Sequence, residues 1–255
     1  MDGISQGGAG VSPAPGLPIR QQAGRLRHDT AALLAFVAVA SFHLAFLFGP
    51  LCLLVLVYLG CLHALRRVAS ARQAFYFGLA VGLGVFVPQM TFMWDIFGPA
   101  AIPLWIILSF FHGLFLLTLN RVEVRFGTRW AMWLAPVLWC GIEYFRSEVW
   151  WLRFAWFTAG SVFPADRAVP FNGVGVYGLG FCFLTYIVAL SRAFARPLPT
   201  RFVSSAFITA IAFASWVATT RSPLPSSPVP PVRVAGIQLE FPGPPEVLIS
   251  EADFS

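Results

Sequence analysis

The sequence predicts an all-α polytopic membrane protein with about seven transmembrane helices. Of its 255 residues, 58% are hydrophobic and only 11% are charged, whereas soluble domains are about 45–50% apolar and about 25% charged. Apolar stretches of roughly 20 residues, the length that crosses a bilayer as a helix, recur along the chain. The basic residues, all Arg, stand mostly in short segments between these stretches. This distribution is typical of topology determinants and argues against a nucleic-acid partner.

Seven apolar spans are expected, at 30–48, 50–65, 74–93, 99–119, 130–146, 173–191 and 201–219. The first two are separated only by Gly49-Pro50, a helix-breaking pair that favours a sharp reversal. The second span is short, so a partly re-entrant segment is an alternative for it.

The segments outside the spans predict four regions along the chain. Residues 1–28, rich in Gly, Pro, Ser and Gln, are expected to form a disordered cytoplasmic tail before the membrane domain at 29–220. Residues 221–232 are a Pro/Ser-rich linker that favours an extended chain. The last region is 233–255, and the pattern VRVAGIQL at 232–239 predicts a buried strand at its start. A single strand does not fold alone, so this region is expected to be the start of a truncated domain.

The Arg distribution also predicts an orientation, because cytoplasmic loops of membrane proteins are enriched in basic residues. With a cytoplasmic N-terminus, seven spans place 12 Arg inside: Arg20, Arg25, Arg27, Arg66, Arg67, Arg72, Arg121, Arg125, Arg129, Arg192, Arg196 and Arg201. The other side receives five: Arg146, Arg153, Arg167, Arg221 and Arg233. The C-terminal end is therefore expected to be periplasmic or extracellular.

Candidate binding residues gather at the outer end of the fifth span. Trp139, Glu143 and Arg146 lie there, and Glu148 and Arg153 follow in the outside loop. Charged groups near a bilayer are costly and are often functional. Glu143 and Arg146 are three residues apart, so on an α-helix they share one face. One interpretation is an ion pair that anchors the helix end; the other is a site for a lipid headgroup or for a domain that docks on this face.

Aromatic and glycine clusters flank this group. The outside loop contains Trp150, Trp151, Phe154, Trp156 and Phe157. They favour either an interfacial belt or a loop that enters the outer leaflet and lines a path for lipid chains. Four glycines around Tyr177 begin the sixth span, at 173, 175, 178 and 180. Small residues there favour close helix packing.

The sequence contains no self-sufficient catalytic centre, and we expect no metal and no cofactor. Cys52, Cys61, Cys140 and Cys182 all fall in apolar segments without metal-ligand spacing, so they are expected to be small buried hydrophobes. His43, His63 and His112 lie in separate spans and are interpreted as interior hydrogen-bonding groups. The motifs of zinc proteases, serine hydrolases and nucleotide-binding loops are absent.

The order of these motifs resembles bacterial apolipoprotein N-acyltransferases. The resemblance rests on Trp139…Glu143-Tyr144-Phe145-Arg146, on Phe154-Ala155-Trp156, on Gly175-Val176-Tyr177-Gly178-Leu179-Gly180-Phe181, and on the linker and strand that follow. It implies an inner-membrane protein whose last residues begin a nitrilase-like α/β domain outside the membrane. It also implies acyl transfer from a phospholipid to the N-terminal cysteine amine of a lipoprotein, through a catalytic Cys, Glu and Lys.

This chain departs from that catalytic set, because it contains no Lys and its Cys lie in the spans. We therefore expect no catalytic residues here and no activity of the chain alone. The expected partners are the membrane, phospholipid and lipoprotein acyl chains. Their binding residues would be Trp139, Glu143, Arg146, Arg153, Trp156 and Tyr177. Alternatives are a non-catalytic membrane protein, either a degenerate paralogue or one that pairs with a separate nitrilase-like catalytic chain, and, less favoured, a small transporter.

Overall fold

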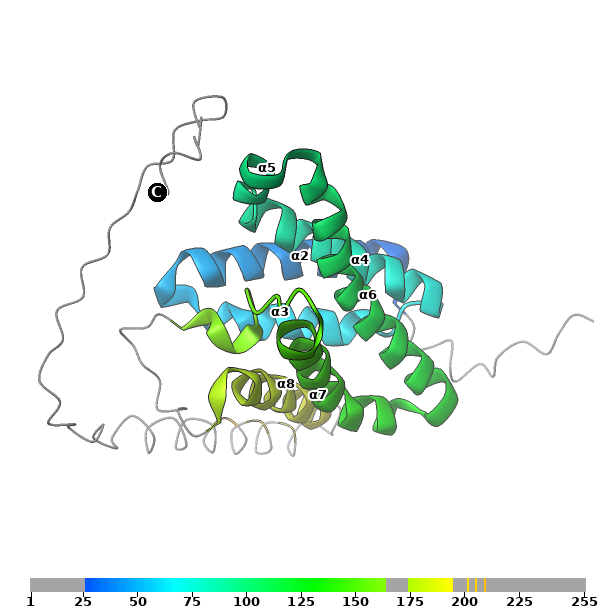
Figure 1. The fold of residues 1–255 in the computed structure, drawn as a ribbon. Coiled ribbons are helices and arrows are strands. Elements are labelled where there is room, and N and C mark those ends of the chain that lie inside the picture. Colours follow the sequence, from blue (N-terminus) through cyan, green and yellow to red (C-terminus); the bar gives the residue numbers. More distant parts are fainter. Residues whose placement is uncertain (1–25, 164–173, 195–200, 202–204, 206–208, 210–255) are drawn as a thin grey trace, which may run out of the picture. The chain divides into compact units, whose positions relative to one another are not determined.

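The computed structural model describes residues 26–163 and 174–194, together with 201, 205 and 209. Every regular element in this part of the chain is helical (Figure 1), as predicted for an all-α protein. The elements are α2 (His28–Leu47), η1 (Gly49–Leu51), α3 (Leu54–Leu65), α4 (Ala71–Gln89), α5 (Phe92–Phe97), η2 (Gly98–Ala100), α6 (Ala101–Phe126), α7 (Thr128–Tyr144), η3 (Phe145–Val149), η4 (Ala159–Val162) and α8 (Gly175–Phe194).

Four helical segments are long and apolar enough to cross a membrane: α2, α4, the run 92–126 and α8. The predicted second span corresponds to α3, which has only 12 residues, so it is too short to cross alone. The fifth corresponds to the 17 residues of α7. A total of seven spans stays a prediction, since the linker, the strand and almost all of the seventh span and of the tail lie outside the described residues.

α2 illustrates how a membrane helix differs from a soluble one. Its buried side includes Ala38 and Phe42, while Leu33 and Phe36 on the other side are 61% and 71% exposed in the absence of lipid. A helix that is apolar all round suits a membrane, where exposed apolar side chains meet lipid tails. α2 packs against α3 and α4.

α4 and α6 pack most closely, through small residues. A Cβ at Gly78 would lie 2.5 Å from the carbonyl oxygen of His112, and one at Gly82 would lie 2.6 Å from Cα of Ser109. Larger side chains would push the helices apart at both points. Lipid tails are as apolar as the helices, so tight backbone contact of this kind is a main source of association in membranes. α2 packs on α4 of this pair, and α7 packs on α6.

Polar contacts join the helix ends where α3 meets α6. Arg66, which caps α3, is 1% exposed, and its Nε lies 3.0 Å from Oε2 of Glu123 on α6. Its guanidinium also donates to the carbonyl of His63. Asn120 donates to the carbonyls of Arg66 and Val68, at 2.7 and 3.1 Å. From the sequence, Arg66 was expected in a cytoplasmic segment between two spans. In the structure its charge is neutralised by Glu123 inside the bundle.

Candidate functional site

The site begins where α7 changes its winding. Trp139 and Glu143 lie on α7, and Arg146 lies in the following π-helical turn, η3. The wider turn is visible in the backbone hydrogen bond from Trp150 to Phe145, which spans five residues at 2.8 Å. Turns of this kind inside helices are rare and often mark functional sites. All three predicted side chains are buried, with exposed fractions of 4%, 4% and 3%.

Glu143 and Arg146 bind the loop that follows them. Glu143 Oε1 accepts a hydrogen bond from the backbone N–H of Ala159 at 2.8 Å. Arg146 Nη2 donates to the carbonyl of Trp156 at 3.0 Å. Among the described residues the only ion pair within 4.0 Å is Arg66–Glu123, so the direct pair considered from the sequence is not formed. The i, i+3 spacing assumed an α-helix, and the π turn that begins at Phe145 alters that register.

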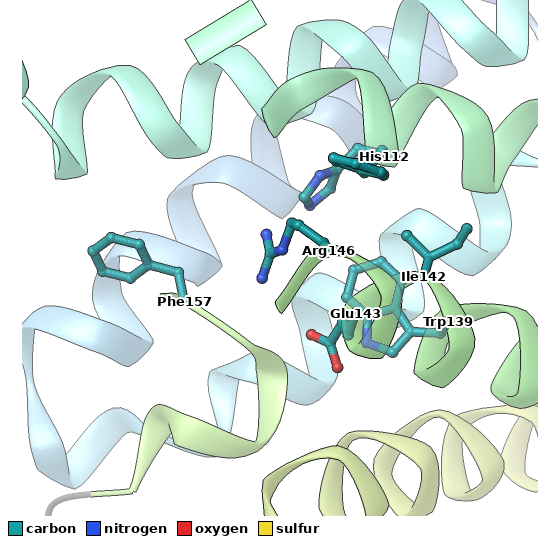
Figure 2. Close-up of a pocket in the computed structure, with 7 residues that line it drawn as sticks. His112, Trp139, Ile142, Glu143, Arg146 and Phe157 are labelled. Carbon is teal, nitrogen blue, oxygen red and sulfur yellow. The ribbon is translucent and has the colours of Figure 1, made fainter. Parts of the chain in front are cut away.

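A small cavity lies against this pair. Figure 2 shows the guanidinium of Arg146 between His112 and Phe157, with the Glu143 carboxylate beside the Trp139 indole. The remaining lining residues are Ile142 and Phe111. The cavity thus joins a carboxylate, a guanidinium and an imidazole within an apolar bundle. It offers hydrogen-bond donors and acceptors in a place where most neighbours are hydrocarbon.

A second row of contacts supports the cavity. The hydroxyl of Tyr58 on α3 and Nε2 of His112 on α6 are 2.6 Å apart. The Trp139 ring packs edge-on against both of these side chains. The Arg146 guanidinium lies over the face of Phe86, 5.6 Å from the ring centroid, a favourable cation–π arrangement. Helices α3, α4, α6 and α7 therefore all contribute to the surroundings of Arg146.

The other three predicted residues lie further out. Arg153 is exposed, and the Trp156 ring is 49% exposed and packs 5.4 Å from Phe92. Tyr177, half-buried at the start of α8, donates to Glu148 at 2.6 Å. The six predicted residues thus form two groups. Trp139, Glu143 and Arg146 are buried, whereas Arg153, Trp156 and Tyr177 are accessible. Both groups lie around the same loop, 150–162.

Several residues of the site were not predicted. Tyr58 and His112 reach it from separate helices, and nothing in their spacing indicated that they meet. Phe157 was grouped with the interfacial aromatics, but it has φ +56° and turns toward α2. Gly180 was expected to serve packing, and it does so against Glu143 itself: a Cβ there would lie 2.9 Å from Oε2.

The expectations for cysteine and histidine hold in part. Cys52 and Cys61 are buried, Cys140 is half-buried, and Cys182 is exposed, so the prediction of burial was wrong for Cys182. Its position on α8 faces outward, where lipid can cover an apolar thiol. His43 bonds the carbonyl of Gly84 at 2.9 Å, as an interior polar group should. The described residues contain no group of three potential metal ligands.

The fold and the site together define a helical membrane domain whose buried charged pair holds an aromatic loop at the end of a π turn. The chain belongs to the apolipoprotein N-acyltransferase family: the family model of the apolipoprotein N-acyltransferase N-terminal domain matches residues 31–190. Over 201 residues the chain is 32% identical to the apolipoprotein N-acyltransferase of Chromobacterium violaceum. That match covers 73% of this chain and 36% of the relative, so the chain spans about a third of the relative's length.

Proposed function

We propose that this chain provides the lipid-binding membrane part of an apolipoprotein N-acyltransferase of the bacterial inner membrane. In the family, the complete protein transfers an acyl chain from a phospholipid to the N-terminal cysteine amine of a lipoprotein. Family membership supports this assignment. The observation that carries it is the loop between α7 and α8, where exposed aromatic side chains and an exposed Arg stand together, next to a small cavity that Glu143 and Arg146 line.

The accessible residues of this loop suit a phospholipid. Trp151 is 80% exposed and Trp156 is 49% exposed, and amphipathic Trp rings favour the boundary between headgroups and acyl chains. Arg153 between them can bind phosphate oxygens through two parallel N–H donors. In this proposal Trp156 and Tyr177 contact acyl chains and Arg153 binds the headgroup. Trp139, Glu143 and Arg146 form the buried layer beneath them.

The test is phospholipid retention by the purified chain. Arg153→Ala should reduce the phospholipid that co-purifies with the protein, measured by mass spectrometry after detergent washing. Arg125→Ala is the matched control, because Arg125 is also exposed but lies at the far end of α6. Equal retention by both variants and the unchanged chain would refute the headgroup role of Arg153.

We also propose that these 255 residues do not transfer acyl chains alone. The sequence contains no Lys, and its four Cys lie at positions 52, 61, 140 and 182, inside the region that matches the membrane domain. The purified chain, given phospholipid and a diacylglyceryl lipopeptide, should leave the mass of the lipopeptide unchanged. If a nitrilase-like catalytic chain is a separate partner, adding it should produce the mass of the acylated lipopeptide.

The proposed orientation places the N-terminus in the cytoplasm and the 150–162 loop outside. Trypsin cleaves only after Arg in this chain, and both Arg125 and Arg153 are exposed. Trypsin added to spheroplasts should therefore cut after Arg153, whereas inverted vesicles should be cut after Arg125. The opposite result would reverse the orientation.

A further inference from the structure

Two charged side chains hold one short stretch of the loop at its two ends. Arg146 binds the carbonyl of Trp156 at 3.0 Å, and Glu143 binds the N–H of Ala159 at 2.8 Å. We call these two hydrogen bonds the two-point clamp. They fix the last residue of the stretch 156–159 to α7, through Glu143, and its first residue to η3, through Arg146. Hydrogen bonds to charged groups are stronger than neutral ones, especially in buried surroundings.

The stretch inside the two-point clamp has a strained backbone. Phe157 has φ +56°, a left-handed conformation that is unfavourable for bulky residues. Such a residue persists only when its surroundings fix it on several sides. The Phe157 ring lies 5.6 Å from that of Phe46 and 6.2 Å from that of Phe42. The clamp and this packing on α2 together hold Phe157 in its unusual conformation.

The two consecutive aromatic rings at this turn have different surroundings. Phe157 faces the bundle and lines the cavity, whereas Trp156 is 49% exposed and packs on Phe92 and Phe154, at 5.4 and 5.1 Å. In an ordinary extended loop the hydrophobic Trp156 ring would occupy several conformations. Here the backbone at 156 is fixed, so the ring has a defined place at the surface.

α8 closes the other side of the stretch. A Cβ at Gly160 would collide with the carbonyl oxygen of Val176, and Gly180 leaves room for the Glu143 carboxylate. The loop therefore lies directly on the first turns of α8. Small residues at both contacts let the backbone of η4, the Glu143 side chain and α8 come together.

We propose that Glu143 and Arg146 are positioning residues: they fix the stretch 156–159 and act on lipid only through the place they give to Trp156. Their burial supports this, since they are 4% and 3% exposed and each already binds the loop backbone. The effect on lipid rests on the function proposed above, whereas the two-point clamp itself does not depend on it.

Trypsin cleavage after Arg153 tests the two-point clamp in the full chain, embedded in phospholipid nanodiscs. Cleavage requires an extended segment on both sides of the bond, which includes 154–157, so release of the clamp should accelerate it. Glu143→Ala removes the acceptor. Losing one charge-assisted hydrogen bond should raise the cleavage rate about tenfold or more. Glu143→Gln keeps an acceptor oxygen and should raise it much less.

Ala159→Pro provides a second variant that leaves both charged residues in place. It removes the N–H donor, and its ring Cδ takes the place of the hydrogen that points at Glu143, so this hydrogen bond cannot form. Proline is tolerated at the first position of a helical turn such as η4. Thr158 has φ −72° and ψ 147°, which are compatible with a following proline. This variant should also accelerate cleavage after Arg153. Cleavage after the exposed Arg125, measured in the same digests, should stay unchanged.

Unchanged cleavage after Arg153 in both Glu143→Ala and Ala159→Pro would overturn the proposal. Equal acceleration by Glu143→Gln and Glu143→Ala would also overturn it, since charge rather than the hydrogen bond would then hold the loop. If Glu143→Ala unfolds the chain and accelerates cleavage after both Arg125 and Arg153, the Ala159→Pro variant decides whether the two-point clamp holds the loop. A confirmed clamp with unchanged lipid retention in these variants would refute the lipid role alone.

Discussion

Glu143 on α7 and Gly180 on α8 are in direct contact: a Cβ at Gly180 would lie 2.9 Å from Oε2 of the Glu143 carboxylate. The same position would be 3.7 Å from Nε1 of Trp139 and from Cβ of Ala159. A glycine is therefore needed where the carboxylate, the indole and the loop meet. The contact joins the glycine-rich start of α8 to the charged end of α7, two features that the sequence presents separately.

Gly180→Ala should destabilise the protein by about 1–3 kcal/mol, because the added methyl group displaces a buried carboxylate that is held by a hydrogen bond. The free energy of unfolding in mixed detergent–SDS micelles measures this effect. Gly141→Ala on α7 is the matched control, since a Cβ there meets nothing within 4 Å. That control should instead stabilise the helix by about 0.5–1 kcal/mol. Equal effects of the two substitutions would contradict the packing described here.

Glu123→Gln should destabilise the opposite end of the bundle, because it leaves the buried Arg66 guanidinium without its counter-charge. Removing one partner of a buried pair costs about 3–5 kcal/mol, and the 18% exposure of Glu123 places the expected loss toward the lower end. The double variant Arg66→Met with Glu123→Gln should recover much of this loss. A double-mutant cycle on unfolding free energies measures the coupling. Additive effects would show that the pair contributes nothing as a unit.

Tyr58→Phe should cost about 0.5–1.5 kcal/mol, because it removes the 2.6 Å hydrogen bond to His112 while keeping the ring. Tyr58 is 2% exposed, so water cannot easily replace its partner. Tyr76→Phe is the control: Tyr76 is 53% exposed, and its loss should stay within about 0.5 kcal/mol. A Tyr58→Phe variant as stable as the control would mean that this hydrogen bond has no net value.

Cys182 should react first with a membrane-permeant maleimide, since it is the exposed thiol among the four. Cys140 should follow more slowly, and the buried Cys52 and Cys61 should react only after unfolding. Mass spectrometry of the peptides from a time course gives the order directly. Reaction of Cys52 or Cys61 at the rate of Cys182 would contradict the packing of α3.

Much of the helical framework could be predicted from the sequence, because a hydrocarbon environment requires long apolar helices with internally satisfied backbones. The helices α2, α4, α6 and α8 lie close to the predicted spans. The site was predicted less completely. Its six residues were predicted because charged side chains are costly near a membrane and aromatic side chains favour its interface. Both reasons concern each residue by itself. Which of them are buried and what they bind depends on neighbours far along the chain.

Composition and periodicity alone determined the class of this protein: an all-α membrane protein with its charged and aromatic residues gathered between α7 and α8. The tertiary structure decided how those residues pair. The π turn after Tyr144 separates Glu143 from Arg146 and directs both to the loop backbone. Gly180 supplies the space for that arrangement from another helix. Local sequence determines which segments form apolar helices. The hydrogen-bond partner of a buried charged side chain depends on contacts between helices that are distant in the sequence.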